Sequence, residues 1–305
     1  MKSLTPLIKE VVLDPYQFAF QRVGKYKPEW IFERYSDKAR EQGFSDLYLI
    51  LSFDCDTPED IPAAETIHTY LHERDIKATY AVPGHILHAG KVVFRNLFNM
   101  GADFLNHGAL PHAEKRDGRY WPVTFYNELS IPEVIVDIQQ GHKIVTDIIG
   151  HPPRGFRAPH FGCIQRSSIL KHIHNVLREM NYRYSTSTIP VFGFRYGPVW
   201  NVNGIYEFPL SGSYNNPLQI LDSWGNIISP SQPVVRDEYA DQFIDTIKKL
   251  KKSGASGILN YYVDPAHVVS SRSFFKALDF VLQQEIPTLY YDDAIKLREG
   301  TDAQP

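Results

Sequence analysis

Short apolar runs alternate along the chain with longer stretches in which apolar residues recur every three or four positions. The short runs have the length and the β-branched and aromatic content of buried strands. Eight strands are predicted, at residues 47–53, 78–82, 103–106, 155–158, 182–186, 205–209, 257–263 and 287–290. The clearest helical patterns span residues 132–149 and 237–252, each with an apolar stripe along one face. Strands that alternate with helices indicate an α/β fold with a mainly parallel sheet.

Eight such strands predict a distorted (β/α)7-8 TIM-like barrel with an N-terminal extension. Residues 1–46 precede the first strand and carry aromatic residues without a clear period, so we expect them to pack as an extension on the barrel. Residues 47–300 are expected to form the barrel domain. Residues 188–236 are rich in Pro, Gly, Asn, Tyr and Trp, which predicts long loops around the short strand at 205–209.

The composition is that of an ordinary globular protein. The 305 residues are 43% hydrophobic and 22% charged, and the formal net charge of -3 gives no footprint for nucleic acid. The two cysteines are too few for a disulfide framework, and each is expected to be a small buried residue. No segment approaches the roughly 20 apolar residues that span a membrane. The N-terminus lacks the apolar core of a signal peptide, which predicts a cytoplasmic protein.

The first predicted strand ends in two carboxylates, Asp54 and Asp56. Alternate residues of a strand point to the same side, so these two acids are expected to face one site. Buried acids repel one another and lose hydration unless a cation or a basic partner compensates. The alternative is a strand-to-helix turn in which one of the acids caps a helix that begins near residues 58–64.

Other polar residues follow the ends of later strands, and in a parallel barrel these ends meet at one rim. His107 and His112, with one carboxylate, would form a facial set for a divalent ion that leaves positions open for water and substrate. Arg157 has a rigid fork of donors that suits it to hold a carboxylate in its ionised form. The alternatives are that the histidines are ordinary loop residues and that Arg157 forms a surface or structural salt bridge.

Taken in order, these segments resemble the polysaccharide deacetylase family, the NodB-homology, carbohydrate esterase family 4-like group of metal-dependent amide hydrolases, in its divergent DxD form. The resemblance extends from about Leu47 to Leu297. The segments that carry it are 52–56, 77–84, the histidine pair, 157–162, 205–210 and 260–265.

The resemblance implies a role for each matching residue. One divalent metal ion, with zinc as the first choice and cobalt, nickel, manganese or iron as alternatives, would be held by Asp56, His107 and His112. Asp54 would act as general base and Arg157 would orient it, while the backbone amide of His160 would stabilise the oxyanion.

Two departures from the family pattern matter. Four residues, Pro111 among them, separate His107 from His112, where the family has three. On a regular helix the extra residue would rotate the second ring by about 100°, so the segment must be irregular or metal binding is weakened. Asp264 stands where relatives place a general-acid histidine. Either burial or like charge raises the pKa of Asp264, or His267 takes the role, or the step is lost.

The loops suggest how a substrate is bound. Tyr214 and Trp224, among other loop aromatics, could offer flat surfaces to sugar rings, although loop packing would explain each one alone. We expect a metal-dependent hydrolase that removes an N-acyl group, acetyl or formyl, from an amino sugar in surface-polysaccharide (O-antigen) biosynthesis. The substrate could be nucleotide- or lipid-linked. The alternatives are a hydrolase of a small cyclic imide, ureide or other amide, and an inactive barrel that binds carbohydrate.

Overall fold

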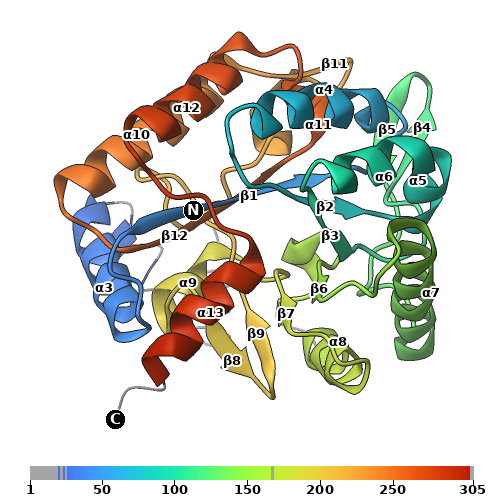
Figure 1. Ribbon diagram of the computed structural model, residues 1–305, viewed down its shortest axis with the longest axis horizontal. Helices are drawn as coiled ribbons and strands as arrows, with labels where there is room; N and C mark the ends of the chain where they lie inside the picture. Colours follow the sequence, from blue (N-terminus) through green and yellow to red (C-terminus); the bar gives the residue numbers. More distant parts are fainter. Residues whose placement is uncertain (1–19, 21–22, 25, 166–167, 303–305) are drawn as a thin grey trace, which may run out of the picture.

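A curled eight-stranded sheet forms the centre of the molecule (Figure 1). The computed structural model describes residues 20, 23–24, 26–165 and 168–302. Neighbouring strands are parallel except for the last pair. Across the sheet the strands are β12 (Gly257–Val263), β1 (Leu47–Asp54), β2 (Thr79–Val82), β3 (Asp103–Asn106), β6 (Gly155–Phe156), β7 (Tyr184–Ser185), β9 (Ile205–Glu207) and β8 (Trp200–Val202).

Helices surround the outer face of this sheet (Figure 1). Two small hairpins stand apart from it, β4 (Ala113–Arg116) with β5 (Arg119–Pro122), and β10 (Ile227–Ser229) with β11 (Gln232–Val235). The α-helices are α3 (Pro28–Glu41), α4 (Asp60–His72), α5 (Gly84–Ala89), α6 (Lys91–Asn99), α7 (Ile131–Ile149), α8 (Ser168–Glu179), α9 (Pro190–Tyr196), α10 (Asp237–Lys252), α11 (Pro265–Val268), α12 (Arg272–Gln283) and α13 (Tyr291–Asp302).

Strand β1 is apolar along its length because both of its faces are covered. Leu49, Leu51 and Phe53 pack in the large core formed with the helices, whereas Ile50 belongs to a separate cluster with residues of neighbouring strands. This alternation directs Asp54, at the end of the strand, to the same side as Ile50. The pattern that makes the strand thus also places the acid inside the curled sheet.

The α/β barrel-like architecture is confirmed, and seven of the eight predicted strands form. The eighth prediction, a strand at residues 287–290, is wrong. In this segment only Thr288 pairs with the sheet, through an isolated parallel bridge to Leu49. The sheet also remains open, with β12 and β8 as its edge strands. The chain that follows β9 reaches β12 through a hydrogen bond from the Ser211 amide to the Asn260 carbonyl, 2.9 Å long.

Residues 188–236 are more ordered than the long loops predicted, since they contain α9, β8, β10 and β11. Helix α9 begins at Pro190, and its C-cap residue, Gly197, has a φ of 93°. Asn203 and Gly204, with φ values of 53° and 91°, connect β8 to β9. An Asn-Gly pair is the usual two-residue hairpin turn, so this part of the segment had a local signal.

The expected extension, residues 1–46, lies partly outside the described residues, which omit 1–19, 21–22 and 25. Its described helix, α3, packs on the sheet: the Tyr35 hydroxyl donates to the Ile258 carbonyl at 2.6 Å, and Phe32 contacts Phe194 edge to face. The boundary at residue 46 stays a prediction. Among the described helices, none combines the length and apolar character needed to cross a bilayer.

Candidate active site

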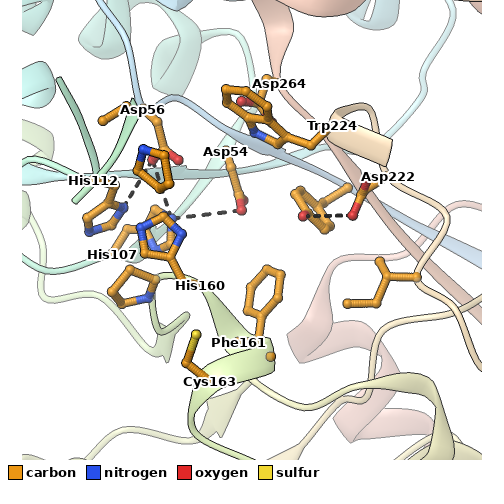
Figure 2. A pocket seen from close by; sticks show the side chains of 16 residues that line it. Asp54, Asp56, His107, His112, His160, Phe161, Cys163, Asp222, Trp224 and Asp264 are labelled. Atoms are coloured by element: carbon orange, nitrogen blue, oxygen red, sulfur yellow. Dashed lines mark hydrogen bonds and ion pairs between the residues drawn. The ribbon is translucent and has the colours of Figure 1, made fainter. Parts of the chain in front are cut away.

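A cavity of about 370 Å³ opens where the parallel strands end (Figure 2). Four carboxylates, three histidines and three aromatic rings are among its 16 lining residues. The lining residues are Asp54, Asp56, His107, His112, Ala113, Pro122, Pro159, His160, Phe161, Gly162, Cys163, Ile220, Asp222, Trp224, Tyr262 and Asp264. The residues that the sequence placed at the ends of strands β1, β3, β6 and β12 therefore do converge.

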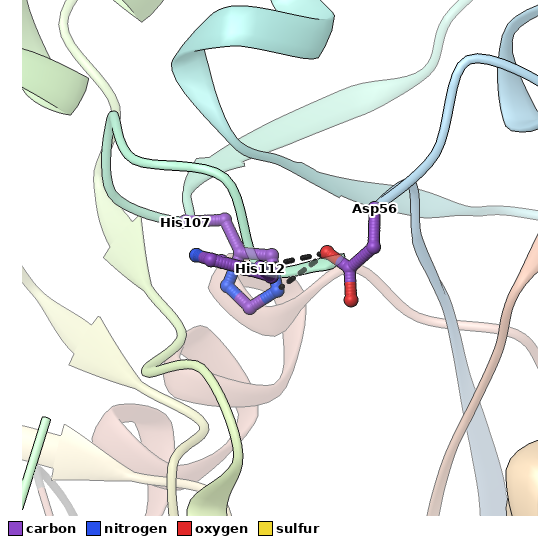
Figure 3. Close-up of side chains that lie close together, drawn as sticks. All are labelled: Asp56, His107 and His112. Atoms are coloured by element: carbon purple, nitrogen blue, oxygen red, sulfur yellow. Dashed lines mark hydrogen bonds and ion pairs between the residues drawn. The ribbon is translucent and has the colours of Figure 1, made fainter. Parts of the chain in front are cut away.

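Asp56, His107 and His112 form one cluster (Figure 3). Each offers one ligand atom, and these atoms all lie within 4.8 Å of one another. Asp56 Oδ1 is 3.1 Å from His112 Nδ1 and 3.7 Å from His107 Nε2. Both histidines are buried. A carboxylate and two imidazoles at this separation are the donor set that divalent transition metals prefer.

The protonation states that the surroundings of His107 and Asp56 favour are also those of metal ligands, namely a neutral imidazole and an ionised carboxylate. His107 Nδ1 lies 2.7 Å from the Arg157 carbonyl and donates to it, which leaves Nε2 as a lone pair directed at the acids. Burial, with His112 beside it, lowers the pKa of His107 well below its usual value. Burial opposes ionisation of Asp56, but the neighbouring histidines lower its pKa below the usual value. His112 Nε2 is buried without a hydrogen-bond partner.

The segment between the two histidines is irregular, as their spacing required. His107 follows β3 and His112 precedes β4, with Gly108 at a φ of 76° between them. Asp137 of α7 holds the segment, because its Oδ1 accepts from the amides of Ala109 and Leu110, both at 2.8 Å. Four intervening residues are thus compatible with two converging rings.

Asp137 was not identified from the sequence. It is buried within the apolar stripe of α7, and a buried acid in such a stripe was the available signal. A Cβ on Gly108 would lie 2.3 Å from Asp137 Oδ2, and one on Gly141 would lie 2.2 Å from Asn106 Oδ1. The loop and α7 therefore fit only with glycine at both positions.

Arg157 is fully buried, so the surface salt bridge considered from the sequence is wrong. Its Nη1 donates to Asp54 Oδ1 in a short hydrogen bond. Its Nη2 donates to Ser52 Oγ at 2.8 Å and to the Tyr291 hydroxyl at 3.0 Å. Burial raises the pKa of Asp54 to about 6, even though Arg157 opposes the shift. Near neutral pH Asp54 is therefore an oriented carboxylate that can accept a proton.

Asp54 and Asp56 do not cap the following helix. The N-cap residue of α4 is Glu59, which makes no side-chain cap. Asp60 instead accepts from the Thr57 amide at 2.8 Å with one oxygen and from the Ala266 amide at 2.9 Å with the other. Asp60 thereby links the loop after β1 to the loop after β12.

Asp264 and His267, the two candidates for the general acid, have different surroundings. Asp264 lines the cavity, and its Oδ1 accepts from Ser223 Oγ at 3.3 Å, while its Oδ2 is buried without a partner. Burial, followed by the charges of neighbouring carboxylates, raises the pKa of Asp264 well above its usual value. His267 does not line the cavity, and burial lowers its pKa to about 4. Of the two candidates, only Asp264 lines the cavity, and its surroundings favour the protonated form of its carboxyl group.

The residues expected to contact substrate are only partly brought together. Trp224 and His160 line the cavity, and the His160 ring donates from Nε2 to the Val123 carbonyl at 2.8 Å. Tyr214 does not line it, which corrects its expected role, because its ring stacks on Phe32 at 5.1 Å. Cys163, expected to be buried, is exposed at the cavity.

Comparisons with known proteins agree with this geometry. The family model described as polysaccharide deacetylase matches residues 42–185. A search of the curated proteins found no match. A solved structure from Mycobacterium smegmatis, described as belonging to the polysaccharide deacetylases, has a TM-score of 0.65 at 14% identity and covers 86% of this chain and 93% of that one.

Two further solved structures share the fold. One, from Pseudomonas aeruginosa PAO1 and described as a polysaccharide deacetylase, has a TM-score of 0.58 at 11% identity, over 85% of this chain and 92% of that one. PuuE allantoinase has a TM-score of 0.59 at 11% identity, with the same coverage. Residues 42–185 carry both histidines, Asp54, Asp56 and Arg157. This segment, just under half of the chain, matches the polysaccharide deacetylase family model, and the fold of the whole chain is similar to that of the solved structures.

Proposed function

We propose that the protein is a metal-dependent hydrolase that removes an N-acyl group, acetyl or formyl, from an amino sugar. The observation that carries the proposal is one cavity that contains a three-residue ligand cluster, a carboxylate oriented by arginine and a second carboxyl group whose pKa is raised well above its usual value. A role in surface-polysaccharide biosynthesis and zinc as the native ion are the finer parts of the proposal.

The proposed metal ligands are Asp56, His107 and His112. A divalent ion bound there would lower the pKa of water and polarise the acyl carbonyl. Asp54 takes a proton from the attacking water, and Arg157 holds the carboxylate in position through Oδ1. The other Asp54 oxygen, Oδ2, lies 3.8 Å from His107 Nε2, so the base is adjacent to the ligand cluster.

The C–N bond then breaks, and the departing amine must receive a proton. Asp264 supplies it, since its pKa is raised well above its usual value, which favours the protonated carboxyl group, and the residue lines the cavity. The 159–161 segment also lines the cavity, and we propose that the His160 backbone amide donates to the oxyanion. The His160 ring, anchored on Val123, fixes this segment.

The test compares amide hydrolysis by the wild type and by Asp56→Ala, after removal of metal and resupply of zinc, cobalt, nickel, manganese or iron. Release of acetate or formate is measured from N-acetyl and N-formyl amino sugars. We expect hydrolysis that chelation abolishes and zinc restores in the wild type but not in Asp56→Ala. Asp241→Ala, which removes an exposed acid on α10, should behave as the wild type.

Three results would overturn the proposal. Absence of a bound divalent ion together with unchanged hydrolysis in Asp56→Ala would exclude the metal mechanism. A small cyclic ureide belongs in the same assay, because the cavity is small and one protein of this fold is an allantoinase. Turnover of the ureide alone would move the substrate away from sugars. Sugar affinity without metal or turnover would instead indicate a carbohydrate-binding barrel.

A further inference from the structure

A second hollow, of about 440 Å³, adjoins the active-site cavity. It is lined by residues 119–122 on one side and by Trp224 with residues 227–230 on the other, and we call it the hairpin groove. Pro122 and Trp224 line both the cavity and the groove, so the two spaces lie side by side and share these walls. The proposed deacylation does not use the groove.

The groove walls are extensions of the active site. Hairpin β4–β5 begins directly after His112, and Ala113 pairs with Pro122 at its base, where both residues line the cavity. Hairpin β10–β11 begins three residues after Trp224. A substrate whose amide lies beside the histidines therefore has a direct path between the two hairpins.

The groove presents an unusual amount of exposed apolar surface. The relative exposures of Trp121, Ile228 and Trp224 are 50%, 49% and 38%. Large apolar side chains gathered at a surface mark a binding site for an apolar group. Because these exposed apolar side chains lie beside the candidate active site, we expect an apolar part of the substrate to occupy the hairpin groove.

The groove has few polar groups left for sugar hydroxyls. The Tyr120 hydroxyl already donates to Glu59 in a short hydrogen bond. Ser229 Oγ accepts from the Gln232 amide at 3.1 Å and lies 3.0 Å from Ser231 Oγ, within its own hairpin. A second sugar ring would therefore find flat apolar surfaces but few hydrogen-bond partners.

One cation in the groove is available to an anion. Lys115 and Arg116 of the same hairpin pair with Glu59 and Glu114 at 2.9 and 2.7 Å. Within the described part of the chain, Arg119 is exposed and takes part in no ion pair of this kind. The cavity, by contrast, is lined by four aspartates and, among the described residues, by no lysine or arginine, so an anionic substituent is better accommodated in the groove.

We propose that the hairpin groove binds an apolar chain joined to the sugar through a phosphate. The inference rests on the proposed function and narrows its substrate to a glycosyl alkyl phosphate. Trp121, Trp224 and Ile228 contact the chain, and Arg119 faces the phosphate. Nucleotide-linked sugars are the competing class of substrate, and the experiment below compares the two classes directly.

The experiment uses four N-acetylhexosamine derivatives that vary the two features separately: unsubstituted, 1-phosphate, octyl glycoside and 1-(octyl phosphate). For the wild-type zinc enzyme, we expect KM to be lowest for the octyl phosphate, by about tenfold relative to the unsubstituted sugar, because burial of two or more methylene groups has this effect. A fifth substrate, the uridine-diphosphate-linked sugar, represents the competing class. Equal KM values for the first four, or a KM for the fifth that is lower than that for the octyl phosphate, would overturn the proposal.

Variants assign the effect to the groove. Trp121→Ala and Ile228→Ser should bring the KM ratio between the octyl and non-octyl substrates close to one. Arg119→Gln should reduce by about threefold the KM ratio between substrates without and with the phosphate, since an exposed ion pair contributes little. It should leave the ratio between the octyl and non-octyl substrates unchanged. The matched controls are Val92→Ser, an exposed apolar residue of α6, and Arg116→Gln, whose partner is Glu114. Neither control should change any ratio.

Binding of octyl phosphate alone separates this inference from the proposed function. Calorimetry should detect its binding to the wild type, and Trp121→Ala should weaken that binding while Val92→Ser should not. If none of the sugars is hydrolysed but octyl phosphate binds in this pattern, the proposed function fails and the groove assignment stands. Absence of binding, or equal binding by both variants, would overturn the groove assignment even if the sugars are deacetylated.

Discussion

Two buried aspartates in one cavity have opposite roles because their neighbours differ. Asp54 receives a hydrogen bond from Arg157, and burial raises its pKa only to about 6. Asp264 accepts a hydrogen bond from the Ser223 hydroxyl, and burial, followed by the charges of other carboxylates, raises its pKa well above its usual value. This difference is the reason that the proposed mechanism uses Asp54 as the base and Asp264 as the acid. The choice between Asp264 and His267, open from the sequence, depends on this difference.

Replacement of Asp264 by Asn tests its role as proton donor. Asn keeps the shape but has no transferable proton, so kcat for an N-acetyl sugar should fall about 10²–10⁴-fold. An aryl ester of the same acyl group should be affected much less, because its leaving group departs without protonation. His267→Gln should keep most of the activity on both substrates. A larger loss in His267→Gln than in Asp264→Asn would assign the acid to His267.

The pH dependence of kcat gives a second readout at this residue. Asp264 must be protonated to donate, so activity that depends on it falls as the pH rises through its raised pKa. We expect the wild type to have an alkaline limb that the Asp264→Asn variant lacks. Profiles of kcat against pH for both proteins, on the N-acetyl sugar, measure the effect. An identical alkaline limb in the variant would remove Asp264 from the proton transfer.

Replacement of Arg157 by Met tests the energetics of the buried pair. The variant leaves the Asp54 carboxylate buried without its cation, so the free energy of unfolding should fall by about 3–5 kcal/mol. Lys77→Met breaks the Lys77–Asp293 pair, which lies at the surface, and should cost less than about 1 kcal/mol. Urea unfolding at neutral pH measures both. Equal losses would show that Arg157 does not compensate Asp54.

At the scale of elements, the loop between the histidines depends on a helix that is distant in sequence. Asp137 on α7 accepts two amide hydrogen bonds from this loop and one from the Tyr126 hydroxyl at 2.6 Å. These bonds fix the backbone that carries His107 and His112. The ligand geometry is therefore a property of β3, α7 and the hairpin that follows.

The Asp137→Asn variant tests this support. The amide group replaces one acceptor by a donor, so the loop loses part of its anchoring, and zinc affinity should fall about 10- to 100-fold. Competition with a chromophoric chelator measures the affinity. Asp147→Asn, on the exposed side of the same helix, is the matched control and should not change it. Unchanged zinc affinity in Asp137→Asn would show that the loop holds its shape without Asp137.

For the molecule as a whole, the sequence predicts the features that follow from hydrophobic periodicity and from the order of the strands. Asp54, His107, Arg157 and Asp264 all follow strands, and the ends of parallel strands meet, so their convergence could be foreseen. The positions of Asp137 and Ser223 could not, because their contacts join segments that no local pattern relates. Tyr214 was misassigned for the same reason: its stacking on Phe32 depends on how α3 packs.

A buried acid that links several elements predicts how stability depends on pH. Glu207 of β9 accepts from His174 of α8 at 2.9 Å and from the Ser187 amide at 2.7 Å. Burial opposes its ionisation, but these partners lower its pKa. Its contribution to stability is therefore complete above the unfolded-state pKa of about 4.3 and is lost as the pH falls through the lower folded-state pKa.

Glu207→Gln should lower the free energy of unfolding at neutral pH by about 2–3 kcal/mol, the value of hydrogen bonds to a charged group. The difference from the wild type should shrink at the lowest pH at which the wild type stays folded, because protonation of Glu207 removes the advantage of its ionised form. Urea unfolding at the two pH values measures it, with the exposed Glu65→Gln of α4 as control. A difference that stays constant with pH would mean that the ionised form of Glu207 has no special stability.

The central claim is that Asp56, His107 and His112 hold the catalytic ion. Crystals grown with zinc, with diffraction measured on both sides of the zinc absorption edge, test it most directly. The account predicts one anomalous peak within coordination distance of Asp56 and one nitrogen of each histidine, and no peak there in Asp56→Ala. A peak at other residues, or none in the wild type with zinc present, would contradict it.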